Sequence, residues 1–74
     1  MDSNQMKAQL AQWLGQELSL ENRLDEDLKL DSLDVIELTM NIEEAYHVML
    51  TPPELMACGT VGGLIQEIIK QHGP

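Results

Sequence analysis

The chain has 74 residues, with 13 acidic and 4 basic side chains and a formal charge of -9. This length allows one domain, and the charge excludes nucleic acid and anionic membranes as partners and favours basic protein surfaces. Cys58 is the only cysteine, which excludes an internal disulfide, and no signal-peptide pattern or membrane-length apolar run is present, so we expect a cytoplasmic protein without membrane insertion.

Near the N-terminus, apolar side chains recur at helical spacing. This pattern predicts a first helix over residues 4–18, with Ser3 as its cap, although Gly15 weakens the pattern toward its end. Residues 19–31 mix leucines with acids and show no clean period. We therefore expect a long ordered loop there, attached to the core by its leucines, and long loops in small domains are often functional.

Two capping signals mark the next helices. Asp31 can cap a second helix over residues 32–46, and Asp34 completes an approximate capping box. The run Thr51-Pro52-Pro53-Glu54 is typical of a helix start, because Thr caps, Pro suits the first turn and Glu closes the box. It predicts a short third helix over residues 52–57.

The last helix is predicted over residues 61–70, with Thr60 as its cap and a single apolar stripe facing inward. Gly62 and Gly63 weaken its first turn but allow close packing. The sequence thus predicts one all-α domain, 1–74, with three longer helices, a short third helix and a long loop after the first. The side chains expected to face inward are Leu38, Ile42, Tyr46, Leu50, Val61, Leu64 and Ile68.

The start of the second helix reads Leu30-Asp31-Ser32-Leu33-Asp34, and here the chain resembles the acyl carrier protein family, whose hallmark is Asp-Ser-Leu at this junction. The resemblance continues through Ser32–Leu38, Ile42–Tyr46 and Thr60–Gly62 and covers roughly residues 24–69. It implies the four-helix acyl-carrier-type bundle and a carrier role rather than an enzyme.

The resemblance also implies a prosthetic group. Ser32, between Asp31 and Leu33, would accept 4′-phosphopantetheine from coenzyme A through a separate Mg²⁺-dependent phosphopantetheinyl transferase, and the arm's thiol would carry acyl groups as thioesters. A phosphodiester just inside a helix N-terminus meets free backbone N–H groups and the positive end of the helix dipole. Since no His or Lys adjoins Ser32 in sequence to activate it, we expect no catalytic residue in this chain.

The second helix has five acids from Asp31 to Glu44 and no basic residue. Such a face is often simply solvated, but the resemblance implies a docking surface for basic-surfaced acyl-processing enzymes. It also implies an acyl chain sheltered between the second and third helices of a monomer. The residues expected to contact partners are Asp34, Ile36, Glu37, Met40, Glu43 and Glu44, with Leu33 in the apolar centre.

One position departs from the family pattern. Lys29 stands where the family usually has glycine, and lysine lacks glycine's backbone freedom and adds a cation near the future phosphate. The pathway lies open between fatty acid synthesis, polyketide assembly and a specialised route, and the departures at Lys29, His47 and Pro52-Pro53 favour a specialised carrier. The absence of a linker favours a free-standing protein.

Two other classes of protein share features with this sequence. A calcium-binding module is suggested by Asp25, Asp27 and Asp31, but the positions that need Gly and a bidentate Glu hold Leu30 and Ile36, so no metal site is predicted. An acidic helical adaptor that keeps the carrier fold and binds partners without a prosthetic group is the alternative that the sequence leaves open.

Overall fold

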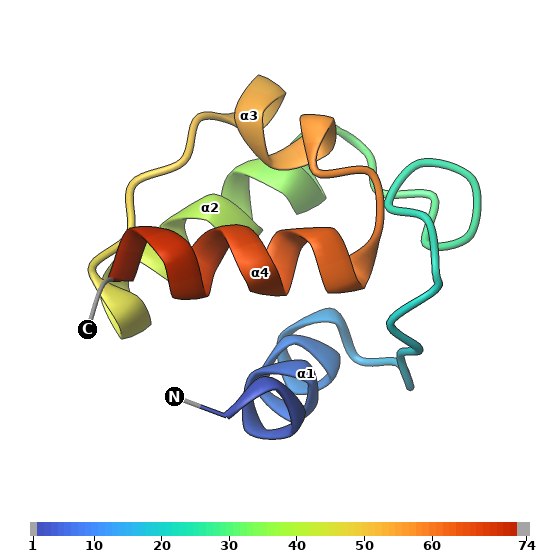
Figure 1. Ribbon diagram of the computed structural model, residues 1–74. Coiled ribbons are helices and arrows are strands. Elements are labelled where there is room, and N and C mark those ends of the chain that lie inside the picture. The colour runs from blue at the N-terminus through green and yellow to red at the C-terminus, as the bar shows by residue number, and fades with distance from the viewer. Residues whose placement is uncertain (1, 73–74) are drawn as a thin grey trace.

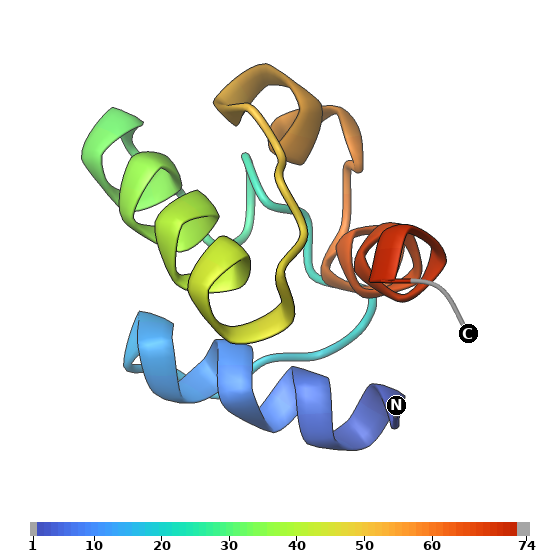
Figure 2. The same ribbon diagram turned by 90° about the vertical axis from the view of Figure 1, so that its left-hand side faces the viewer.

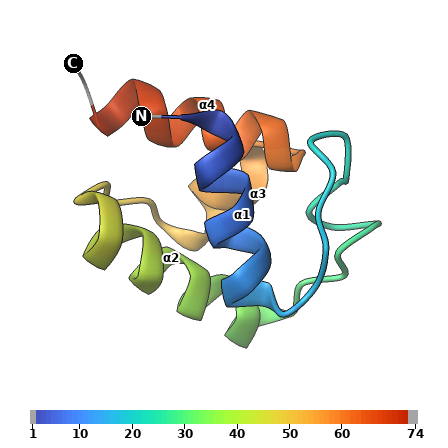
Figure 3. The same cartoon turned by 90° about the horizontal axis from the view of Figure 1, so that it is seen from below.

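The computed structural model describes residues 2–72, which form α1 (Ser3–Leu14), α2 (Ser32–Tyr46), α3 (Pro52–Ala57) and α4 (Val61–His72). α2 and α4 lie on opposite sides of the centre, with α3 above them and α1 crossing below (Figure 1, Figure 2 and Figure 3). This is the all-α bundle expected from the sequence. Within residues 2–72, no helix is both long and apolar enough to cross a membrane.

Apolar side chains from all four helices, from the loop of residues 15–31 and from the connection of residues 47–51 meet in one core. Each fully buried leucine, isoleucine or valine contributes roughly 1.5–3 kcal/mol relative to exposure. Of the inward-facing residues predicted, only Tyr46 is half-buried rather than buried, and its ring packs edge-on against Trp13, with centroids 6.0 Å apart. The others are buried: Leu38, Ile42, Leu50, Val61, Leu64 and Ile68.

The prediction for α1 was wrong at both ends. The helix ends at residue 14 rather than 18, because Gly15 adopts a left-handed conformation with φ 69° that stops the helix. Leu18 continues the apolar spacing and is buried, but it reaches the core from the loop. At the start, Asp2 rather than Ser3 is the cap, and its carboxylate accepts a hydrogen bond from the amide two residues on.

The loop of residues 15–31 is attached to the start of α4 by backbone hydrogen bonds. The Leu24 amide donates to the Gly59 carbonyl at 3.0 Å, and the Val61 amide donates to the Asn22 carbonyl at 2.9 Å. Buried Leu24 and Leu28 fix the loop from the inside, as the sequence predicts, and Leu18 adds a third buried leucine. The prediction was wrong for Leu20, which is 44% exposed.

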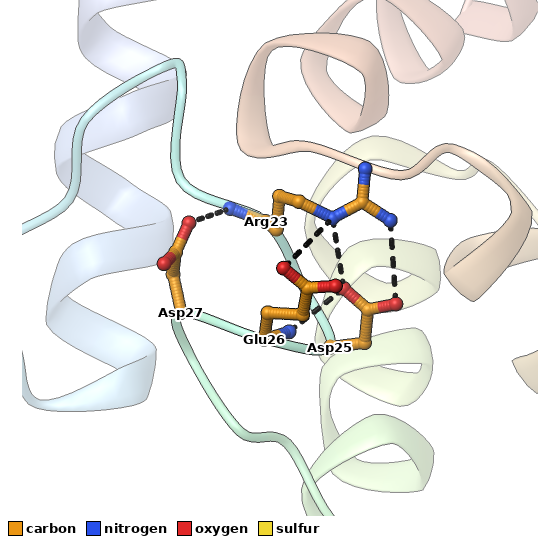
Figure 4. A network of polar contacts seen from close by, with 4 residues as sticks. All are labelled: Arg23, Asp25, Glu26 and Asp27. Atoms are coloured by element: carbon orange, nitrogen blue, oxygen red, sulfur yellow. Dashed lines mark hydrogen bonds and ion pairs between the residues drawn. The ribbon is translucent and has the colours of Figure 1, made fainter.

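An exposed polar network folds the acidic part of this loop (Figure 4). The Arg23 guanidinium donates to both carboxylate oxygens of Asp25, at 3.2 and 3.3 Å, while the Arg23 amide donates to Asp27 at 2.7 Å. The Arg23 contact holds the pKa of Asp25 below its usual value. These acids therefore hold the loop's own backbone and Arg23 in place. Within residues 2–72 no group of three or more His, Cys, Asp or Glu side chains is arranged to bind a metal ion.

The ends of α2 and α4 meet. His47 ends α2 in the left-handed conformation, with φ 59°, and the His72 ring donates Nδ1–H to the Tyr46 carbonyl at 2.9 Å. This contact lies beyond the predicted end of α4 at residue 70, and the helix continues to residue 72. α2 and α3 have the predicted bounds, residues 32–46 and 52–57.

Close packing at the start of α4 requires glycine. A Cβ on Gly63 would overlap the Cys58 carbonyl oxygen, and one on Gly62 would come within 3.1 Å of the Leu20 carbonyl oxygen. The Thr60 hydroxyl accepts the Gly63 amide at 3.0 Å, as the predicted cap requires. The two glycines thus weaken the helix locally but allow the loop to lie directly against it.

Candidate functional site

Ser32 is the first residue of α2, and its side chain lies at the surface. The residue before it, Asp31, is the helix cap: its carboxylate accepts the Asp34 amide at 2.8 Å, and the Asp34 carboxylate accepts the Asp31 amide at 3.2 Å. This reciprocal capping box was predicted from the sequence, and it fixes the backbone direction on which the Ser32 hydroxyl is presented.

The helix start favours an anion on Ser32. The first amides of a helix have no partner within the helix, and the capping box engages only that of Asp34, which leaves the amides of Ser32 and Leu33 without a hydrogen-bond partner among residues 2–72. These N–H groups and the positive end of the helix dipole suit a phosphate ester. The exposed position also lets a separate enzyme reach the hydroxyl.

An apolar groove of about 320 Å³ opens beside Ser32, between the start of α2 and α3. The Pro52-Pro53 pair and Met56 form its α3 side, and Met56 is half-buried. The sequence pointed to Pro52-Pro53 only as a helix start and an uncommon pair and did not point to Met56, because only the packing of α3 against α2 brings these residues near Ser32. The full lining is Leu30, Asp31, Ser32, Val35, Ile36, Pro52, Pro53 and Met56. The group expected on Ser32 thus has both an exposed attachment point and an apolar surface next to it.

The predicted partner residues form one exposed face of α2. Its apolar centre is large for a surface: Leu33 is 63% exposed, Ile36 45% and Met40 61%. Residues spaced three and four apart share a helix face, which places Glu37 and Glu44 along the same stripe. Every salt bridge within residues 2–72 belongs to Arg23, so none involves the acids of this face. The four acids expected there are all exposed: Asp34, Glu37, Glu43 and Glu44.

Lys29 precedes the site in a conformation that its residue type disfavours. Its φ of 53° is left-handed, a conformation that glycine adopts readily and that costs energy for a residue with a Cβ. The turn directs the buried Leu28 and the half-buried Leu30 to the core on either side of it. Within the described chain, only His47 shares this positive φ among non-glycine residues.

The remaining titratable candidates have structural environments. Cys58 is half-buried, its thiol donates to the Glu54 carbonyl at 3.5 Å, and burial raises its pKa. Burial also raises the pKa of Tyr46. His47 caps the C-terminus of α2.

The comparisons with known proteins all indicate the same family. A family model for the phosphopantetheine attachment site matches residues 4–68. An acyl carrier protein from Wolinella succinogenes is 38% identical over 53 residues, 72% of this chain and 70% of the relative. One from Buchnera aphidicola is 37% identical over 70 residues, covering 90% and 88%, and one from Borrelia garinii is 37% identical over 57 residues, covering 77% and 71%.

Proposed function

The chain belongs to the acyl carrier protein family, whose members are carriers rather than catalysts and hold 4′-phosphopantetheine covalently, and on that premise we propose that Ser32 is the attachment residue. The observation that supports this most is the position of Ser32 as the exposed first residue of α2, directly after its Asp31 cap. Residues 1–74 would act together as a single carrier domain, a proposal supported by the family match over residues 4–68.

In the attachment step, the Ser32 oxygen forms a bond to the phosphorus of coenzyme A that bears the pantetheine. The bond between the two phosphates breaks, adenosine 3′,5′-bisphosphate leaves, and a base on the transferase takes the hydroxyl proton. This chain contributes exposure, orientation by the capping box and the amides of Ser32 and Leu33 that face the new phosphodiester. The attached arm supplies a thiol that holds an acyl group as a thioester.

The groove between α2 and α3 is proposed to shelter part of the cargo. Its volume of about 320 Å³ and its apolar walls suit a hydrocarbon chain better than a polar one. Half-buried Met56 adds an adaptable side chain to that wall. The cargo belongs to fatty acid, polyketide or a related specialised biosynthesis, and Lys29 with Pro52-Pro53 favours a specialised carrier.

The exposed face of α2 is proposed to dock the transferase and basic-surfaced acyl-processing enzymes. Unpaired acids steer a basic partner and speed its arrival, while the apolar centre of Leu33, Ile36 and Met40 supplies contact area. Asp34 has a second task here, because its carboxylate also closes the capping box. A monomer in the cytoplasm remains the expectation from the sequence.

The competing proposal is an acidic adaptor that binds the same partners without a prosthetic group. Replacing Ser32 with Ala separates the two, because Ser32 is exposed and its loss leaves the Asp31–Asp34 capping box in place. A carrier loses all acyl loading in Ser32→Ala, measured by intact mass after incubation with coenzyme A, a transferase and an acyl-loading enzyme. An adaptor would bind partners equally well and show no loading in the wild type.

A further inference from the structure

Lys29 stands three residues before Ser32, in the turn that leads into α2. Its backbone is left-handed, with φ 53°, and its side chain is exposed, whereas Leu28 is buried and Leu30 is half-buried. Any residue with a Cβ bears the cost of that conformation, so the backbone gives no reason for a cation at this place. The part of Lys29 that the turn does not explain is its ammonium group.

The acids close to Lys29 along the chain already have other partners. Three of them contact Arg23, through its guanidinium or its backbone amide (Figure 4): Asp25, Glu26 and Asp27. The other two, Asp31 and Asp34, accept each other's amides in the capping box. Within residues 2–72, the Lys29 ammonium takes part in no salt bridge. Lys29 is therefore an exposed cation whose neighbouring carboxylates are engaged elsewhere.

An arm on Ser32 would place a phosphodiester beside two carboxylates. It would add a negative charge to a chain of charge -9, next to Asp31 and Asp34, which are both exposed at the start of α2. The unpartnered amides of Ser32 and Leu33 offset part of this repulsion. The end of a helix dipole is equivalent to only about half a positive charge, however. A full counter-charge has to come from a side chain.

Lys29 is the lysine or arginine closest to Ser32 along the chain. Three residues span at most about 11 Å between Cα atoms, and both the flexible four-carbon stem of lysine and the phosphate on the serine oxygen shorten that gap. Arg23 is farther along the chain and is engaged in the ion pairs of its own loop. The remaining lysines, Lys7 and Lys70, lie on α1 and α4, and neither helix lines the groove beside Ser32.

On the premise of the proposed function, that Ser32 carries the arm, we propose that Lys29 is the counter-ion of the arm's phosphodiester and a positioning residue for the arm. The ammonium pairs with a phosphate oxygen, while the amides of Ser32 and Leu33 donate to the phosphate from the side of the helix. The phosphate is then held between the turn and the helix start. Because the pair forms only after attachment, it stabilises the modified protein and leaves the unmodified one unchanged.

Phosphoserine installed at position 32 by codon suppression tests the pair without a transferase. Its phosphorus is bound to the same serine oxygen, and its second pKa, ordinarily about 6, is measured by ³¹P NMR. A neighbouring cation favours the dianion, so Lys29→Met should raise this pKa by about 0.15–0.7 pH units at low salt, and Lys29→Arg should keep it low. Both variants keep a Cβ at position 29 and the carboxylates of Asp31 and Asp34. Lys70→Met, which removes an exposed cation from α4, is the matched control and should change the pKa by less than about 0.1.

The protein that carries the arm gives a second readout. Attachment should raise the melting temperature of the wild type by about 1–8 °C more than that of Lys29→Met, and equally in the wild type and Lys70→Met. An equal phosphate pKa in the wild type and Lys29→Met would overturn the proposal, as would a gain in melting temperature that does not depend on residue 29. If no transferase modifies Ser32, the attachment residue is wrong, and the phosphoserine titration still decides whether Lys29 pairs with an anion on that oxygen. The two proposals therefore fail separately.

Discussion

Replacing Lys29 with Gly should stabilise the protein, because the backbone there already has the conformation that glycine prefers. With φ at 53°, a residue with a Cβ bears about 1–2 kcal/mol of left-handed strain. Glycine loses about 0.5–1 kcal/mol more conformational entropy on folding, which offsets part of the gain. The expected net increase in unfolding free energy is about 0.5–1 kcal/mol, or about 2–8 °C in melting temperature for a domain of this size.

The matched control is Lys29→Ala. Both variants remove the lysine charge from a molecule of charge -9, so their difference isolates the effect of the Cβ. Urea denaturation followed by circular dichroism gives both free energies, and the glycine variant should exceed the alanine variant by about 0.5–1 kcal/mol. Equal stability of the two variants would refute the assignment of strain to this turn.

Substitutions at three positions and one alkylation experiment test other parts of the structure. Gly63→Ala should lower the free energy of unfolding by about 1–3 kcal/mol, since its Cβ would overlap the Cys58 carbonyl oxygen. Asp31→Ala should lower it by about 1 kcal/mol through loss of the α2 cap, and Asp31→Asn by much less. Hydrogen bonds from Thr51 hold the pKa of Glu54 below its usual value, so the stabilisation they give is present above that usual value and is lost as pH falls through the lowered one. The stability difference between wild type and Glu54→Gln should therefore shrink over that interval. Cys58, with a pKa raised by burial, should react with iodoacetamide at pH 8 several-fold more slowly than free cysteine.

Each of these has a clear contrary result. Alanine at the exposed position 66 of α4 is the control for Gly63→Ala, and equal stability of the two would contradict the overlap. An Asp31→Ala protein as stable as wild type would mean that the cap is dispensable. A constant difference between wild type and Glu54→Gln across the acid range would remove the linkage argument, and fast alkylation of Cys58 would contradict its burial.

Local chemistry determined how far the sequence could predict this fold. The starts of α2 and α3 follow from the capping side chains Asp31 and Thr51, each of which bonds to the first turn of its own helix. The end of α1 could not be predicted in the same way, because Leu18 fits both a continuing helix and a loop that returns to the core, and Gly15 decides between them.

The residues of the candidate site also differ in whether a local segment or the packing of distant helices places them. Ser32 and the face of α2 follow from one short segment, so their spacing is readable from the sequence. The groove wall at Met56 depends on α3, a helix distant from Ser32 in the chain, and nothing in the local pattern indicates which helix packs where.

The attachment of phosphopantetheine can be tested most directly inside the chain itself. Ser3 is a natural control for Ser32, because it too is the first residue of a helix and follows an aspartate cap, Asp2. Incubation with coenzyme A and a broad-specificity transferase, followed by peptide fragmentation in a mass spectrometer, should locate one phosphopantetheine on Ser32 and none on Ser3 or Ser19. Modification of another serine, or no modification by a transferase that modifies a known acyl carrier protein in parallel, would contradict the account.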